Sequence, residues 1–287
     1  MKVFKDKTSL RNFLEPFRAE KKSIGLVPTM GALHGGHISL VETCKKKNDI
    51  CVVSIFVNPL QFNDKSDYEK YPHTPEADVE LLEKARTDVL FIPDYSEMYV
   101  SNPMLKFQFG KLEAVMEGAF RPGHFSGVGI VVSKLFNIIQ PTDAYFGQKD
   151  FQQVLIVKQL VKDLSYSINI HTCPTMRDTD GLAMSSRNKR LDESSRALAA
   201  ELYKSLKKAA DYGHRSSNVH AEQLKKIIVE HLAQYPEIVT EYVEVAHKET
   251  LDLMSGECNP EDVVMLLACY IGGVRLIDNM FVKDQQL

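Results

Sequence analysis

The sequence lacks several features that would place a protein in a membrane or a secreted class. No apolar run approaches the roughly 20 residues that an α-helix needs to span a bilayer. The first seven residues are too charged for a signal peptide. The five cysteines form no Cys-x-x-Cys pair, so the pattern predicts neither a disulfide framework nor a zinc site. We therefore expect a cytoplasmic protein with reduced, mostly buried thiols.

The sequence also lacks a strong positive charge. A net charge of -3 over 287 residues leaves no basic footprint for nucleic acid and no polybasic patch for a membrane surface. Small or already charged ligands are therefore the expected partners. Three common signatures are missing as well: Gly-x-Gly-x-x-Gly, the Walker A loop and the Gly-x-Ser-x-Gly elbow. A hydrophobic content of 44% and a charged content of 25% are typical of a globular protein of one large or two ordinary domains.

Apolar strand-like runs alternate with helical patterns up to about residue 174. The run from Ile50 to Val57 is continuous and rich in β-branched residues, which is typical of a parallel strand buried on both faces. Further strands are predicted at 23–27, 89–92, 143–146 and 167–171, and helices at 36–47, 75–85, 128–139 and 151–163. The segment 118–129, rich in Gly, Arg and His, is predicted to be a loop. This alternation predicts an α/β fold in which residues 1–174 form a Rossmann-like parallel sheet domain.

The pattern changes after Pro174. A long amphipathic helix is predicted from Asp192 to Tyr212, with Asp192 as its cap and Gly213 as its end, followed by a second helix at 220–231. Residues 241–246 alternate as a half-exposed strand, and Gly272-Gly273 joins two apolar runs as a tight hairpin. Residues 175–287 are therefore predicted to form a smaller α+β domain with an antiparallel sheet.

The segment Val27–His37 reads as a strand, a glycine-bearing turn and a helix start. A helix N-terminus approached through glycine residues is a ready anion site. His34 and His37 would lie on one face of the first helical turn. Three interpretations stay open from the residues alone: imidazoles that contact phosphate, a capping pair without a ligand, and a metal site.

Other polar side chains follow the second and fourth predicted strands. Because ligands of open parallel sheets collect at the carboxyl ends of the strands, these side chains are further candidates. Gln61 and Gln153 carry amides that can hold a hydroxyl and a carboxylate, and Lys149 can contact a phosphate oxygen. The alternative interpretation of each is a solvated surface side chain, which is the usual state of such residues. The remaining candidates are Asn58, Asp150, Arg121, His124 and a second phosphate clamp at Met184-Ser-Ser-Arg187, whose alternative is a capping turn.

Five segments together resemble one family. Pro28–His37 resembles the His-x-Gly-His element of the nucleotidyl-transferring α/β superfamily shared with class I aminoacyl-tRNA synthetases, with Gly35 at its variable position. With four further segments in the expected order, the chain is similar to the pantothenate synthetase (pantoate–β-alanine ligase) family. These segments are Phe56-Val-Asn-Pro-Leu-Gln-Phe62, Phe120-Arg-Pro-Gly-His-Phe125, Tyr145-Phe-Gly-Gln-Lys-Asp-Phe-Gln-Gln153 and Asp180-Gly-Leu-Ala-Met-Ser-Ser-Arg-Asn188.

The resemblance implies a cytoplasmic, ATP- and Mg²⁺-dependent acid–amine ligase of pantothenate biosynthesis, usually a homodimer. Such an enzyme joins ATP and (R)-pantoate into pantoyl adenylate with release of pyrophosphate. The amine of β-alanine then displaces AMP. Water must be kept from the mixed anhydride, so residues 175–287 would act as a lid hinged near residues 175–190. The alternative is a nucleotidyltransferase of the same fold that acts on another small acid or on a phosphate acceptor.

The resemblance also implies roles for individual residues. His37, His34 and Lys149 would be the catalytic residues, and Gln61, Gln153 and Asn58 would bind pantoate and β-alanine. The residues that would bind ATP are Met30, Gly31, His34, His37, Gly147, Gln148, Lys149, Asp150, Met176, Met184, Ser185, Ser186 and Arg187. His73 stands where many members carry arginine. Asp78 is the only match to a carboxylate sometimes placed near magnesium, and we predict no metal ligand from the sequence.

Overall fold

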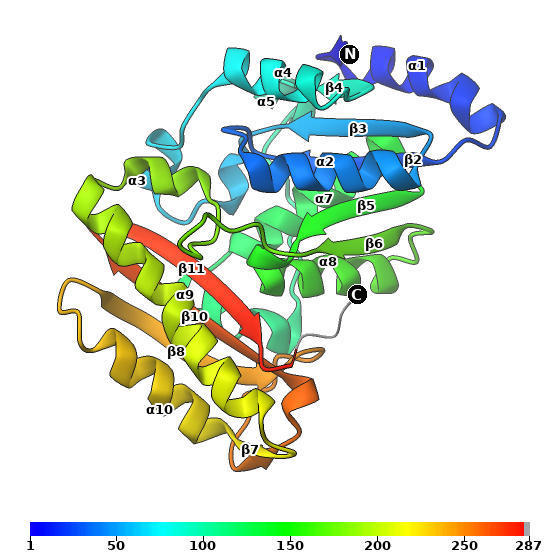
Figure 1. Cartoon of the computed structure of the whole chain (residues 1–287). Coiled ribbons are helices and arrows are strands. Elements are labelled where there is room, and N and C mark those ends of the chain that lie inside the picture. The colour runs from blue at the N-terminus through cyan, green and yellow to red at the C-terminus, as the bar shows by residue number, and fades with distance from the viewer. Residues whose placement is uncertain (284–287) are drawn as a thin grey trace. The chain divides into compact units, whose positions relative to one another are not determined.

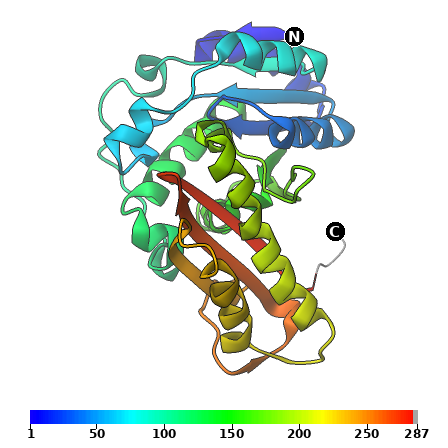
Figure 2. The same cartoon turned by 60° about the vertical axis from the view of Figure 1, so that its left-hand side comes forward.

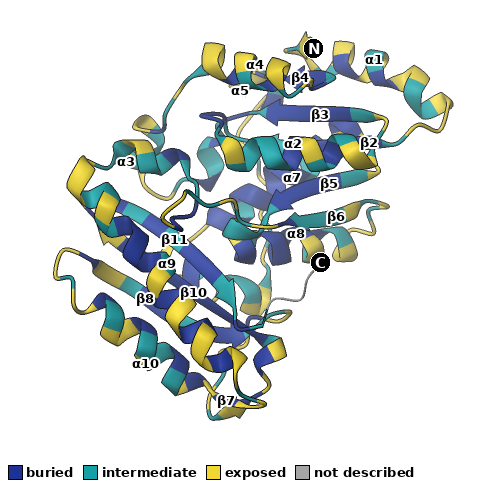
Figure 3. Cartoon of the chain, viewed as in Figure 1, coloured by how far each residue is buried: buried dark blue, intermediate teal, exposed yellow. Residues whose placement is uncertain are grey.

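The computed structural model describes residues 1–283, and the chain divides into two compact units (Figure 1). The first unit comprises Met1–Gln148 and Gln153–Pro174, and the second comprises Lys149–Gln152 and the chain from Thr175 onward. Residues 284–287, at the end of the predicted second domain, lie outside the described residues. Each unit encloses its own apolar clusters. Figure 3 shows these buried residues along the strands and on the inner faces of the helices.

The first unit is built on a six-stranded parallel sheet, which confirms the predicted fold class. Its order is β1-β4-β3-β2-β5-β6. The strands are β1 (Lys2–Phe4), β2 (Ile24–Thr29), β3 (Ile50–Ile55), β4 (Val89–Phe91), β5 (Asp143–Gly147) and β6 (Asn169–Cys173). The sequence pattern did not predict β1, because three residues between charged neighbours carry too little periodicity to mark an edge strand.

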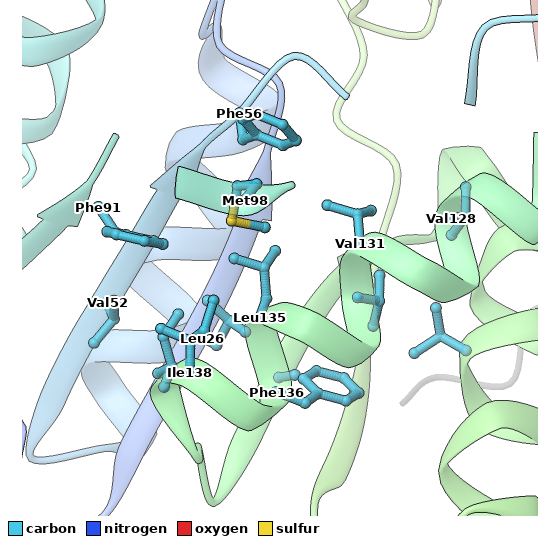
Figure 4. Packing of buried hydrophobic residues seen from close by; sticks show 14 of the residues in the cluster. Leu26, Val52, Phe56, Phe91, Met98, Val128, Val131, Leu135, Phe136 and Ile138 are labelled. Atoms are coloured by element: carbon cyan, nitrogen blue, oxygen red, sulfur yellow. The ribbon is translucent and has the colours of Figure 1, made fainter. Parts of the chain in front are cut away.

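Helices cover both faces of this sheet. Side chains alternate along β2 and β3, so Leu26 and Val52 enter one apolar cluster while Val27 and Val53 enter another. The first face is covered by α1 (Lys7–Ala19), α7 (His124–Ile139) and α8 (Phe151–Asp163), and the second by α2 (Gly35–Lys47) and α4 (Pro75–Lys84). Figure 4 shows part of the first cluster, where Leu135 and Ile138 of α7 lie near Leu26 of β2. No helix within the described part of the chain is long and apolar enough to cross a membrane.

Helix α7 begins four residues earlier than the sequence predicted. Gly127 and Gly129 read as loop signals, but both lie inside the helix and are buried. A Cβ on Gly127 would meet the carbonyl oxygen of Leu60 at 2.2 Å, and one on Gly129 would meet the ring of Phe107 at 2.8 Å. The two glycines therefore let the helix pack closely against its neighbours. A short helix, α6 (Met116–Phe120), occupies part of the predicted loop that precedes it.

The second unit contains an antiparallel sheet, as predicted, and its three strands have the order β11-β10-β8. Gly272 and Gly273, both with positive φ, form the tight turn between β10 (Val263–Ile271) and β11 (Val274–Phe281). Helices α9 (Glu193–His214) and α10 (Ala221–Leu232) cover one face of this sheet (Figure 2). Its third strand, β8 (Val239–His247), lies at the edge next to β10. The side chain of Asp192 caps α9, accepting a hydrogen bond from the Ser195 N–H at 2.7 Å. A second small sheet pairs β7 (Val219–His220) with β9 (Glu257–Cys258).

Candidate active site

The centre of the parallel sheet contains a topological switch point. The chain runs from β2 outward through β3 to β4, and then returns to the other side of β2 to form β5 and β6. Ligands of open α/β sheets bind outside the carboxyl ends of the strands at such a point. The strands β2, β3 and β5 end at the same edge of the sheet, and each of the segments that follow them carries predicted site residues.

The turn after β2 is held in an unusual conformation by a buried carboxylate. Gly31 and Ala32 have positive φ values of 80° and 50°, which is the left-handed region. The backbone N–H groups of Ala32 and Leu33 donate to the two oxygens of Asp78 at 2.9 and 2.8 Å. Asp78 is 2% exposed and also accepts the hydroxyl of Thr74 at 3.1 Å. Asp78 therefore fixes the shape of this turn from within the protein.

His34 and His37 lie side by side at the start of α2, with their rings tilted by 47°, and cap it. The N–H of Gly36 donates to Nδ1 of His34 at 3.2 Å, and the N–H of His34 donates to Nδ1 of His37 at 3.3 Å. Because both Nδ1 atoms accept, each ring carries its proton on Nε2. The ring centroids are 4.1 Å apart. The pair can thus cap the helix with one nitrogen of each ring and offer an N–H donor with the other.

The segment after β3 carries two buried amides. Asn58 caps the short helix η1 (Pro59–Gln61) and is 0% exposed. Its amide nitrogen donates to Oε1 of Gln61 at 3.1 Å. The Nε2 of Gln61 lies 3.0 Å from Sδ of Met30, at the end of β2. This contact joins the segment that the resemblance assigns to the acid substrate with the segment that it assigns to ATP.

His124 and Arg121 support the backbone of Gln61. The carbonyl of Gln61 accepts from Nδ1 of His124 at 2.7 Å and from Nη2 of Arg121 at 3.5 Å. Because Nδ1 carries the proton, Nε2 of His124 accepts from Nη1 of Arg121 at 3.3 Å. Arg121 in turn pairs with the buried Glu117 at 3.3 Å. These two candidates from the predicted loop therefore position Gln61, which sequence reasoning did not foresee.

The segment after β5 forms η3 (Gln148–Asp150) and the first turn of α8. Lys149 lies two residues beyond the end of β5, and its carbonyl oxygen accepts from Nδ2 of Asn279 on β11 at 2.9 Å. Gln153 is half-buried on α8. The Asn279 contact ties the backbone of Lys149 to the second unit, to which Lys149 also belongs by packing. The interactions of the ammonium group of Lys149 stay a prediction.

The candidates of the second unit lie on a short hairpin-like strip. The N–H of Met184 donates to the carbonyl of Met176 at 2.9 Å, and the hydroxyl of Ser185 caps the short helix η4 (Ser186–Arg190). Arg177 anchors the strip through a two-point ion pair with Asp278, at 2.7 and 3.0 Å. Ser185 therefore has the capping role that was the alternative interpretation of this motif. An ATP contact by Met176, Met184, Ser185, Ser186 or Arg187 stays a prediction.

Asp78, the match to a carboxylate sometimes placed near magnesium in the resembled family, holds the turn after β2. Both of its oxygens accept hydrogen bonds, from two backbone N–H groups and from a hydroxyl. Among residues 1–283, no group of three or more His, Cys, Asp or Glu side chains is placed to hold a metal ion. His73, at the position where many members of the resembled family carry arginine, is exposed.

Comparison with protein families gives one match over nearly the whole chain. A family model described as pantoate-beta-alanine ligase matches residues 2–281. A protein of Cytophaga hutchinsonii named pantothenate synthetase is 46% identical over 273 residues, which cover 95% of this chain and 96% of the relative. One of Porphyromonas gingivalis with the same name is 43% identical over 99% of this chain and 100% of the relative.

Solved structures of similar proteins cover both units. The crystal structure of pantothenate synthetase from Thermus thermophilus matches with a TM-score of 0.92 and 38% identity, over 99% of this chain and 100% of that chain. Pantoate-beta-alanine ligase from Francisella tularensis matches with a TM-score of 0.82 and 36% identity, over 99% and 98% of the two chains. That crystal contains beta-gamma ATP and beta-alanine.

Proposed function

The chain belongs to the pantoate–β-alanine ligase family, and from this premise we propose how its strand-end site performs the reaction. The chain is an acid–amine ligase that uses ATP to join pantoate and β-alanine into pantothenate. The observation that carries our assignment of residues is the 3.0 Å contact between Gln61 and Met30. It brings the amide proposed to hold the acid next to the turn proposed to hold the nucleotide.

We propose that the first step is an in-line attack on ATP. A carboxylate oxygen of pantoate forms a bond to the α-phosphorus, and the bond from that phosphorus to the bridging oxygen of pyrophosphate breaks. The Nε2–H groups of His34 and His37 donate to phosphate oxygens, whose negative charge develops as the bond breaks, and Lys149 adds a positive charge. No side chain needs to form a covalent bond, because positioning and charge stabilisation supply the catalysis.

In the second step the amine of β-alanine attacks the acyl carbon of pantoyl adenylate. A carbon–nitrogen bond forms, the carbon–oxygen bond to AMP breaks, and the amine loses a proton. Gln61 and Gln153 hold the pantoyl group through their amides during both steps. Asn58 acts on this group through Gln61, because its own amide is fully buried.

We propose that magnesium enters the site with ATP, held by phosphate oxygens and water rather than by a carboxylate cluster of the protein. Mg²⁺ commonly binds in this way at nucleotide sites. The hydrogen bonds of Asp78 support this proposal, since they leave that carboxylate committed to the turn after β2. We assign no catalytic step to the ion.

We further propose that the enzyme is a cytoplasmic homodimer. Five free, buried cysteines suit a reducing compartment. Val100, Met104 and Leu105 are 90%, 98% and 61% exposed, and such exposed apolar residues are typical of an interaction surface. Light scattering should give about twice the chain mass of 32.5 kDa. A mass of one chain at micromolar concentration would contradict the dimer.

Exchange of labelled pyrophosphate into ATP tests the proposed function. We expect exchange in the presence of pantoate and ATP without β-alanine, because adenylation is reversible and precedes amine attack. Small acids that lack the hydroxyl groups of pantoate serve as controls and should support little exchange. Exchange that required another acid or a phosphorylated acceptor, and that ignored pantoate, would refute the assignment.

A further inference from the structure

Asn58 makes four hydrogen bonds inside the first unit. Its Oδ1 accepts from the hydroxyl of Tyr99 at 2.9 Å and from the N–H of Leu60 at 3.3 Å. Its Nδ2 donates to the carbonyl of Gly127 at 3.1 Å and to Oε1 of Gln61 at 3.1 Å. All the polar atoms of this buried side chain thus have partners, and the side chain links helix α5 (Tyr95–Met98), which Tyr99 follows directly, to Gln61.

Two backbone groups fix the direction of this chain of hydrogen bonds. The N–H of Leu60 can only donate and the carbonyl of Gly127 can only accept, so the amide of Asn58 has one possible orientation. The Gly127 carbonyl comes within hydrogen-bond distance of Asn58 because Gly127 has no Cβ that would clash with the backbone of Leu60. The NH₂ group of Asn58 therefore faces Gln61, and Oε1 of Gln61 accepts the hydrogen bond. The other end of the Gln61 amide is then a donor.

The donor end of the Gln61 amide has a weak hydrogen-bond partner, Met30. Its Nε2 lies 3.0 Å from the thioether sulfur of Met30, and a thioether is a poor hydrogen-bond acceptor. An oxygen of a substrate accepts more strongly and would replace the sulfur. A carboxylate or hydroxyl oxygen fits this position, whereas an ammonium group, which can only donate, does not.

Tyr99 is suited to hold this arrangement in place. The residue is 2% exposed and its ring packs 5.9 Å from that of Phe56, measured between centroids. Burial raises the pKa of Tyr99 well above its ordinary value, so the hydroxyl keeps the proton that it donates to Asn58. The hydroxyl supplies one of the two donors that hold Oδ1 of Asn58.

We propose that Tyr99 is a positioning residue for the acid substrate: by donating to Asn58, it adds to the two backbone groups that hold this amide, and so keeps the amide of Gln61 in place with an N–H facing an acceptor oxygen of pantoate. The inference rests on the proposed function, which places pantoate at Gln61. It also specifies the direction of that hydrogen bond, with Gln61 as the donor and the ligand as the acceptor. The position therefore favours an oxygen of pantoate and disfavours the amine of the second substrate.

The chain of hydrogen bonds from Tyr99 through Asn58 to Gln61 is called the relay below. The Tyr99→Phe variant tests this relay because it removes only the hydroxyl. We expect the KM for pantoate to rise about three- to tenfold, while the KM for ATP stays within twofold, since a single hydrogen bond to Asn58 is lost. Tyr95→Phe is the matched control. Tyr95 lies one helical turn away on α5, and its hydroxyl contacts Asn102 at the surface. The control should change neither KM.

A double-mutant cycle separates a relay from a general loss of order. If Tyr99 acts through Gln61, Tyr99→Phe should have no further effect on pantoate in the Gln61→Ala background. Gln61→Glu gives a second test, because it replaces the donor end with a carboxylate oxygen. It should raise the KM for pantoate more than Tyr99→Phe does.

Several results would overturn the relay. These are an equal rise in the KM for ATP and pantoate, a Tyr99→Phe effect that persists in Gln61→Ala, no effect of Tyr99→Phe, or an unchanged pantoate KM in Gln61→Glu. All four comparisons require that the unaltered chain is active with pantoate. An unaltered chain without pantoate-dependent exchange would instead refute the proposed function, and the relay would fall with it.

Discussion

In each of the two histidines at the start of α2, one ring nitrogen caps the helix and the other is proposed to contact phosphate. The Nδ1 atoms accept backbone N–H groups and cap the helix, so the capping interpretation of the pair is part of the structure. The proposed phosphate contact uses the Nε2–H groups instead. The phosphate-contact and capping interpretations, two of the three that the sequence left open, are thus compatible with each other, because imidazole offers an acceptor and a donor on one ring.

Substitution of His37 by Asn or Gln separates these tasks. The side-chain oxygen of Asn can replace Nδ1 as an acceptor but reaches no further, whereas the amide of Gln can place a donor near the position of Nε2. We expect His37→Asn to lower the adenylation rate by about 10²- to 10³-fold with little loss of thermal stability. His37→Gln should retain more activity. Single-turnover formation of adenylate measures both, and a His37→Asn rate near that of the unaltered chain would remove His37 from catalysis.

Asp78 illustrates a residue whose part in the site is invisible in the sequence. Its partners Ala32 and Leu33 lie far away along the chain, on the turn after β2. By resemblance, the sequence offered Asp78 only as a match to a carboxylate sometimes placed near magnesium, without predicting it as a ligand, and its hydrogen bonds assign it to the backbone of the turn after β2. The same holds for Tyr99 and His124, which reach Asn58 and Gln61 through tertiary contacts.

Asp78→Asn should loosen the turn after β2. The new NH₂ group would face a backbone N–H that now donates to a carboxylate oxygen, leaving a buried donor without its acceptor. We expect a loss of about 2–4 kcal/mol in the free energy of unfolding and a larger rise in the KM for ATP than for pantoate. Glu76→Gln, an exposed change in the first turn of the same helix, is the control. Equal stability of the two variants would refute the role of Asp78.

Among whole elements, the sequence predicted the buried strands and the start of α2 well. The continuous apolar run at β3 and the glycine-to-histidine transition after β2 are local signals that tertiary packing did not override. The start of α7 was wrong because Gly127 and Gly129 serve close packing and not chain flexibility. Gly213 is similar: it lies inside α9 instead of ending it, and a Cβ there would meet Val282 at 2.4 Å. Sequence alone cannot tell a glycine that ends a helix from one that lets a neighbour approach.

A polar cluster joins α2, β5 and β6 at the end of the sheet remote from the proposed site. Asp143 accepts from Nε2 of His171 at 2.7 Å, from Nδ2 of Asn48 at 2.8 Å and from Nδ2 of Asn169 at 3.3 Å. Burial by itself would raise the pKa of Asp143, but these hydrogen bonds together outweigh it and lower the pKa below the ordinary value of 3.8. The ionised carboxylate therefore stabilises the folded state.

This cluster predicts a pH dependence of stability. Because the folded-state pKa of Asp143 is depressed, its contribution is complete above its ordinary pKa and is lost as the pH falls through the folded-state value. Asp143→Asn should cost about 2 kcal/mol in the free energy of unfolding at pH 7. The gap between variant and unaltered chain should narrow as the pH falls from 5 toward 3 in urea unfolding experiments. A gap that stays constant over this range would show that the charge of Asp143 does not matter.

Over the whole molecule, the two units divide the predicted roles unequally. The first unit contains both histidines and both glutamines proposed to act on the substrates, and their supporting contacts are internal to it. The second unit contains Lys149, whose backbone is tied to Asn279, and the strip from Met176 to Arg187. The roles of this strip in ATP binding and of the second unit as a lid stay predictions, because sequence resemblance alone carries them.

The proposed first step requires that the carboxylate of pantoate attacks the α-phosphorus of ATP. Pantoate labelled with ¹⁸O in both carboxyl oxygens tests it directly, with mass spectrometry of the products after complete turnover with ATP and β-alanine. We predict one ¹⁸O in each molecule of AMP and one in the amide carbonyl of pantothenate, with unlabelled pyrophosphate. Unlabelled AMP together with ¹⁸O in the released phosphate groups would contradict the account.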